Sequence, residues 1–123
     1  MYPERQDQLK QVLENMQLIE GAIVRCEEIA KRGDYPGAWE GAERMYERFP
    51  NDNILNQLRA NLTTEAATFV KSIRRAQQLE QKGLLGSSLA WYLKAQNLYP
   101  HSEFAKDGID RLVAQVLPDD SDE

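Results

Sequence analysis

GDYPGAWEGAERMYERFP, residues 33–50, carries the clearest structural signals in this chain. The segment opens with a glycine turn, and Pro36 suits the first turn of a helix, where the missing N–H of proline costs nothing. Apolar side chains then recur every three or four residues up to Pro50, which is the spacing of one helical face. The pattern predicts a helix over residues 36–48 with an apolar stripe formed by Tyr35, Ala38, Ala42, Met45 and Phe49.

The same pattern returns 50 residues later as GLLGSSLAWYLKAQNLYP, residues 83–100. In this alignment Gly33 matches Gly83 and Pro50 matches Pro100, and the apolar positions between them also agree. A third copy begins after Pro100 and stops after one helix. A fixed period of helical pairs is typical of a solenoid.

The remaining stretches between Gly and Pro residues predict further helices. An apolar seam from Leu9 to Ala30, spaced alternately by three and four residues, predicts a helix over residues 4–32 that lies along another helix. The apolar positions after Asn53 continue to Gly83 and predict one long helix over residues 52–82, followed by a short helix from Leu85 to Tyr99 and a last helix capped by Ser102. No segment shows the alternation of a strand. We therefore expect an all-α fold of five helices, with residues 1–117 as one domain and 118–123 as a disordered acidic tail.

Residues 33–50 resemble the second helix of a tetratricopeptide repeat, with its Gly-Asp-Tyr turn, its small residues toward the partner helix and its closing proline. The resemblance covers residues 19–50 and 69–100, and it implies antiparallel helical hairpins of an α-solenoid, with two extended repeats and a C-terminal capping helix. The period exceeds the family's about 34 residues, so each first helix carries an N-terminal extension of roughly 16 residues. Arg25 and Arg75 also stand where the family usually has leucine.

The extensions, residues 4–18 and 52–68, have heptad-like seams. We expect them to pack against each other or against another subunit, so a homo-oligomer is one predicted outcome. Long repeats of this kind also give the chain a looser resemblance to kinesin-light-chain-like proteins.

Charge and hydropathy narrow the classes of partner. The formal net charge is −5, and four of the negative charges lie in the last five residues, which leaves residues 1–118 close to neutral. Nucleic-acid binding requires a basic face, so no nucleic-acid partner is expected. No apolar run approaches the roughly 18 residues of a membrane span, and the N-terminus has no export signal. We expect a cytoplasmic protein, or a periplasmic one if a signal peptide has been removed.

The residues able to carry chemistry are few. Cys26 is the only cysteine and His101 the only histidine. Cys26 falls in the apolar seam and is expected to be a packed core residue, whereas His101 follows Pro100 in a turn and is expected to be solvated. The glycines sit at helix ends rather than after a strand, so no phosphate-binding loop is predicted. We expect no catalytic residues, no metal and no cofactor, and therefore no enzyme.

More residues are candidates for binding a partner protein. In the tetratricopeptide register, the first helix of each copy is exposed to a partner. The candidate residues are Ile23, Glu27 and Lys31 from one copy and Arg74 and Gln77 from the next. Alternatively, Ile23 packs the two long helices together. Ile23 and Glu27 stand where family members that bind chaperone carboxylates have a polar and basic clamp, so that class of ligand is not expected.

Aromatic and basic residues extend the candidate surface. Trp39 and Tyr46 flank the seam of their helix and are predicted partner contacts, with Trp39 exposed, whereas Trp91 is expected to be buried against the last helix. Basic residues are concentrated at one place in the sequence, at Lys71, Arg74, Arg75 and Lys82. They form either a binding site for an acidic segment, from a partner or from the chain's own tail, or a solvated face.

The function expected from these features is a non-catalytic protein–protein interaction module, a tetratricopeptide-like adaptor or scaffold that docks a segment of a partner protein on a helical face. Two alternatives remain open. One is a structural accessory protein that binds a cytoskeletal filament, as the kinesin-light-chain-like resemblance implies. The other is a domain of an envelope-assembly lipoprotein, because residues 99–102 resemble the segment before the capping helix in bacterial envelope tetratricopeptide proteins.

Overall fold

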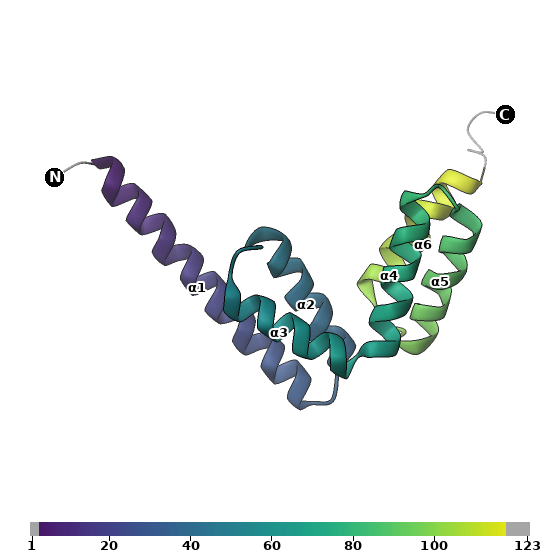
Figure 1. Cartoon of the computed structure of the whole chain (residues 1–123), viewed down its shortest axis with the longest axis horizontal. Helices are drawn as coiled ribbons and strands as arrows, with labels where there is room; N and C mark the ends of the chain where they lie inside the picture. Colours follow the sequence, from purple (N-terminus) through teal and green to yellow (C-terminus); the bar gives the residue numbers. More distant parts are fainter. Residues whose placement is uncertain (1–2, 118–123) are drawn as a thin grey trace. The chain divides into compact units, whose positions relative to one another are not determined.

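Residues 3–117 are described by a computed structural model, in which they form six α-helices and no strand (Figure 1). The chain divides into two compact units, Met1–Leu62 and Thr63–Glu123, which are considered separately below. In the first unit, α1 (Pro3–Lys31) packs along α2 (Tyr35–Arg48), and most of α3 (Asn53–Glu65) also belongs to this unit. In the second unit, α4 (Ala67–Gln81) packs along α5 (Leu85–Leu98), and α5 packs along α6 (Glu103–Val116). The expected all-α class is thus confirmed.

The turns at Gly33 and Gly83, 50 residues apart, have the same pattern of hydrogen bonds. Gly33 and Gly83 both adopt positive φ angles, 86° and 76°, which a residue without a Cβ accepts at little cost. The N–H groups of Gly33 and Asp34 bond to the carbonyls of Ala30 and Ile29, and those of Gly83 and Leu84 bond in the same way to Glu80 and Leu79. The repeat seen in the sequence is therefore repeated in the backbone.

Short polar side chains begin three of the helices. Asp34 Oδ1 accepts a hydrogen bond from the N–H of Gly37 at 3.0 Å, and Asp52 Oδ1 accepts one from Leu55 at 2.7 Å. Ser102 Oγ accepts one from Ala105 at 2.9 Å, which confirms the expected cap of the last helix. Each cap satisfies an N–H that has no partner inside its helix.

Four predicted helices are confirmed to within a few residues, but the single helix over residues 52–82 is wrong. The chain turns at Ala66, whose φ of −107° and ψ of 32° interrupt the helix between α3 and α4. No Gly or Pro marks the break. Thr63 and Thr64 are poor helix formers, and Glu65 places a negative charge at the negative end of α3. These weak local preferences allow the chain to turn here, so that α3 contacts α2 through Arg59 while α4 packs along α5.

The core of the second unit centres on Tyr92, which is fully buried. Its Oη donates a hydrogen bond to Glu80 Oε1 at 2.8 Å, and Arg111 on α6 donates to both oxygens of the same carboxylate at 3.1 Å. Ser88, also buried, donates from Oγ to the Ala76 carbonyl at 2.6 Å. Polar groups on α4, α5 and α6 are thereby satisfied inside the unit.

The core of the first unit is built from small residues and one large ring. Ala38 and Ala42 on α2 have no exposed surface, and Cys26 on α1 is buried. A Cβ at Gly41 would lie 3.2 Å from Cys26 Sγ, so α1 and α2 approach each other closely here. Trp39, Leu55 and Leu62 are buried in the same unit.

None of the helices described is long and apolar enough to cross a membrane. The expected tail, 118–123, lies outside the described residues, and the expectation of one domain over residues 1–117 stays a prediction.

We predict that Gly108→Ala destabilises the protein. A Cβ at position 108 would lie 2.5 Å from the ring of Tyr92, which is held by its hydrogen bond to Glu80, so a helix or the ring must shift. The expected loss of unfolding free energy is about 1 to 3 kcal/mol, measured by urea denaturation. Gly86→Ala is the matched control, because a Cβ there meets nothing within 4 Å. Equal stability of the two variants would contradict the packing described.

The Glu80 carboxylate predicts a dependence of stability on pH. The hydrogen bond from Arg111 is the main cause that holds the pKa of Glu80 below its usual value. A carboxyl whose pKa is lower in the folded state stabilises the fold above its unfolded pKa, and this contribution disappears as the pH falls through the folded pKa. Glu80→Gln should therefore cost about 1 kcal/mol at pH 7 and almost nothing near pH 3.

Urea denaturation at the two pH values checks this expectation. The exposed Glu28 of the first unit provides the control, since Glu28→Gln should change stability little at either pH. A cost of Glu80→Gln that is the same at both pH values would show that the ion pair is not its source.

Candidate functional site

The residues expected to bind a partner fall into two sets. Glu27 and Lys31 on α1 are exposed and Ile23 is half-buried; all three belong to the first unit. Arg74 and Gln77 on α4 are exposed and belong to the second unit. Within each unit the residues lie on one helix, as the sequence spacing predicts. The joining of the two sets into one groove stays a prediction.

The expectation that Trp39 is exposed is wrong, since only 1% of its surface is accessible. Trp39 shares one face of α2 with Glu43 and Tyr46, and this face lies toward α3. Arg59 of α3 pairs with the Glu43 carboxylate through Nε and through Nη2, the latter at 3.0 Å. The sequence alone did not show that α3 would return over this face. Trp39 is therefore a core residue and is not accessible to a partner.

Tyr46 is half-buried, and one face of its ring is covered. The guanidinium carbon of Arg59 lies 3.9 Å from the ring centroid, which is a close cation–π contact. The pKa of Arg59 is raised, chiefly by its hydrogen bond to Glu43. Tyr46 thus helps to hold α3 on α2, and a partner would reach only its remaining edge.

The reactive side chains occupy the environments that the sequence suggested. Cys26 is buried, and this burial is the main cause that raises the pKa of its thiol. His101 is exposed, with its ring edge-on to Tyr99 at 6.1 Å between centroids. No cluster of His, Cys, Asp or Glu suited to a metal ion occurs among the described residues.

A surface that the sequence did not resolve lies along the first half of α1. The apolar seam packs inward from Ala22 to Cys26, but four large apolar side chains before it are exposed over half or more of their surface. They are Leu9 at 60%, Val12 at 53%, Leu13 at 51% and Met16 at 50%. The sequence predicted that this stretch packs against the second extension or against another subunit, and this stays a prediction. We call these four residues the α1 seam.

A second surface surrounds Trp91 on α5. Trp91 was expected to be buried against the last helix, but it is only half-buried and lines a cavity together with α4 residues, among them Lys71 and Arg75. The ammonium nitrogen of Lys94 lies 4.7 Å from the centroid of the Trp91 ring, which is a cation–π contact. Lys94 was missed as a member of this group, although its position three residues after Trp91 on a helix signals a shared face.

Comparison with known proteins gave no matching family model, no matching curated protein and no matching solved structure.

We predict that Cys26 reacts slowly with thiol reagents in the folded protein. Its sulfur is covered by the α1–α2 contact, and the raised pKa leaves little of the reactive thiolate at neutral pH. Alkylation by iodoacetamide at pH 8, followed by mass spectrometry, should be at least about tenfold slower in buffer than in denaturing urea. Similar rates in the two conditions would show an accessible thiol and reopen a chemical role.

Proposed function

We propose that this chain is a non-catalytic protein-interaction module of tetratricopeptide-like hairpins, which binds a helix of a partner protein along the α1 seam. The observation that carries the proposal is the exposure of Leu9, Val12, Leu13 and Met16 on a single helix. Exposed apolar residues gathered on one face are typical of interaction sites, whereas isolated ones are ordinary.

The hairpin architecture has its own support. The Gly33 and Gly83 turns share their φ angles and hydrogen bonds, and α2 and α5 each contain 14 residues. The ends of these helices also correspond, because the N–H groups of Phe49 and Tyr99 bond to Met45 and Ala95. Two equivalent hairpins at a fixed period favour a repeat protein, and repeat proteins commonly present helical faces to partners.

The spacing of the seam specifies the shape of its ligand. Leu9, Val12 and Met16 are separated by three and four residues, which is the repeat that lets two helices supercoil around each other. Leu13 widens this stripe, as in helices that pack in bundles. The expected ligand is therefore an amphipathic helix with a similar apolar stripe.

The residues beside the seam carry little charge. Gln8 and Asn15 flank it, and Asn15 accepts a hydrogen bond from Gln11 at 3.0 Å. Selection by opposite charge, as at the flanking positions of many coiled coils, is thus weak, and apolar fit dominates. Burying the exposed part of each seam side chain contributes on the order of 1 kcal/mol, and the entropy of association offsets part of the sum. We expect an affinity of modest strength.

A photo-crosslinking amino acid tests the proposal. Placed at Val12 or Met16, it should give a crosslinked product in the source cells, and mass spectrometry should map the other end to a helix. Placed at Gln11, which is exposed on the opposite face of the same helix, it should give little of that product. Val12→Glu with Met16→Glu should abolish the product while changing the unfolding free energy by no more than about 0.5 kcal/mol, because both side chains are exposed.

Leu18→Glu is the matched control, since it adds an acid to an exposed apolar position outside the seam and should keep the product. A product that maps to a second copy of this chain would identify the partner helix as α1 itself. Crosslinks of equal yield at Gln11 and at the seam positions, or a product that survives the seam variant, would contradict the proposal.

A further inference from the structure

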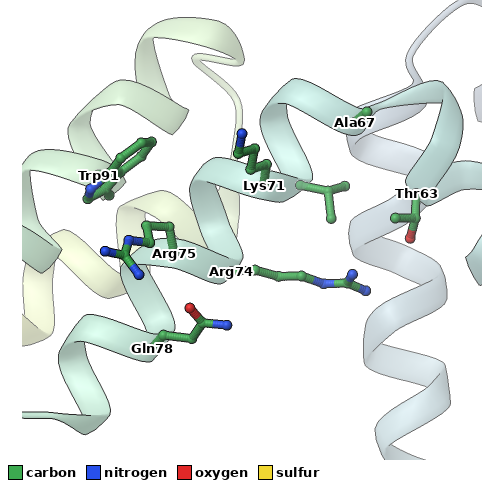
Figure 2. A pocket seen from close by; sticks show the side chains of 8 residues that line it. Thr63, Ala67, Lys71, Arg74, Arg75, Gln78 and Trp91 are labelled. Atoms are coloured by element: carbon green, nitrogen blue, oxygen red, sulfur yellow. The ribbon is translucent and has the colours of Figure 1, made fainter.

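A cavity of about 440 Å³ runs along α4, with all its lining residues in the second unit. Its lining comes from one side chain at the end of α3, from several residues of α4 and from one residue of α5 (Figure 2). In Figure 2, Arg75 lies on the Trp91 side of α4, whereas Arg74 extends in the opposite direction. The residues that line it are Thr63, Ala67, Val70, Lys71, Arg74, Arg75, Gln78 and Trp91.

A smaller cavity of about 260 Å³ adjoins the first through shared residues. Ala67, Lys71 and Trp91 line both cavities, and the smaller one adds Lys94. Because these three residues are shared, the two cavities form one surface. We call this surface the Trp91 groove.

The charge of the Trp91 groove is entirely positive. Lys71, Arg74, Arg75 and Lys94 line it, and none of the residues that line either cavity is acidic. None of the four cations forms an ion pair with another residue of the described chain. This lack of partners contrasts with the composition, in which 20 acidic residues outnumber 15 basic ones.

Holding these cations together has a cost in the absence of a ligand. Lys71 is three residues before Arg74 and four before Arg75 on the same helix, and like charges at these spacings destabilise a helix. A bound anion removes this repulsion. The groove is therefore electrostatically matched to a negatively charged ligand.

The groove also has an apolar part that a simple anion would leave uncovered. The half-buried Trp91 lines the cavity together with Ala67 and the buried Val70. Tryptophan and arginine are the residues that most often dominate the energy of protein interfaces. A ligand that fits both parts carries several negative charges and at least one large apolar side chain.

We propose that the Trp91 groove binds an extended acidic segment of a partner protein, with one aromatic or large aliphatic side chain placed against Trp91. From Ala67 to Gln78 the groove follows α4 for 11 helical steps, or about 16 Å, which matches roughly five extended residues. The site is separate from the α1 seam. Nucleic acid is disfavoured because the chain has a net charge of −5 and the basic area is short.

The chain contains an acidic segment of its own at residues 118–123, PDDSDE. This segment supplies four negative charges but no aromatic or large aliphatic side chain for the place beside Trp91. The segment therefore matches the basic part of the groove but has no side chain for the apolar part. A partner segment that has both features is therefore the better ligand.

Titration with a synthetic peptide tests the proposal on the full chain. The probe is a fluorescein-labelled seven-residue peptide with one phenylalanine among glutamates and aspartates, followed by anisotropy at low and at physiological salt. We expect saturable binding, which weakens by roughly tenfold or more in Lys71→Glu with Arg75→Glu. Lys10→Glu with Lys106→Glu makes the same change of net charge at exposed residues that line neither cavity, and it should preserve binding. Circular dichroism checks the fold of each variant.

Two comparisons make the role of the ring testable. Replacing the phenylalanine of the peptide by alanine should weaken binding to the natural chain, and Trp91→Ala should remove that difference. The α1 seam variant should bind the peptide normally, so that failure of the seam proposal leaves this result unaffected.

Three results would overturn the inference. The first is equal weakening by both pairs of charge reversals, which would show attraction by net charge alone. The second is equal binding of the phenylalanine and alanine peptides. The third is binding that appears only after the acids of residues 118–123 are changed to amides, which would make the chain's own tail the occupant.

Discussion

The unequal length of α1 and α2 is the constraint from which the first unit follows. α1 contains 29 residues and α2 contains 14, so about 22 Å of α1 extends beyond what one antiparallel neighbour of that length covers. The apolar seam nevertheless continues through both halves of α1. In the second half it packs against α2 through Ala22 and Cys26, and in the first half its side chains are exposed. One sequence pattern thus produces a core and a surface.

The second unit shows the opposite situation, because its three helices have nearly equal lengths of 15, 14 and 14 residues. Its interior is closed by Tyr92, which contacts the position of Gly108 and shares the Glu80 carboxylate with Arg111. Since these polar groups are satisfied internally, the remaining cations of α4 lie outside the core. These cations stay at the surface, where they line the Trp91 groove.

The sequence predicted the helical class, four of the helices and the positions of the two glycine turns, since glycine, proline and capping residues act locally. It missed the break at Ala66, because the apolar spacing runs through this residue and no breaker marks it. The break is decided by packing at a distance, with α3 paired to α2 through Arg59 and α4 paired to α5.

The candidate surfaces show the same division between local and distant causes. Trp39 was expected to be exposed because a helical stripe alone does not reveal which later helix will cover it. Trp91 and Lys94 share a face of α5 that the spacing could reveal, but their meeting with Lys71 and Arg75 depends on how α4 and α5 pack. Residue spacing identifies a face, and tertiary structure decides whether that face is core or surface.

Hydrogen exchange of the backbone amides of α1 tests most directly whether its first half lacks a partner. The measurement uses mass spectrometry at a concentration where light scattering gives the mass of one chain. The amides of residues 8–16 should exchange at least about tenfold faster than those of residues 20–30, because only the second stretch is held by α2. Equal protection of the two stretches in the single chain would mean that the seam is already covered, and would contradict the account.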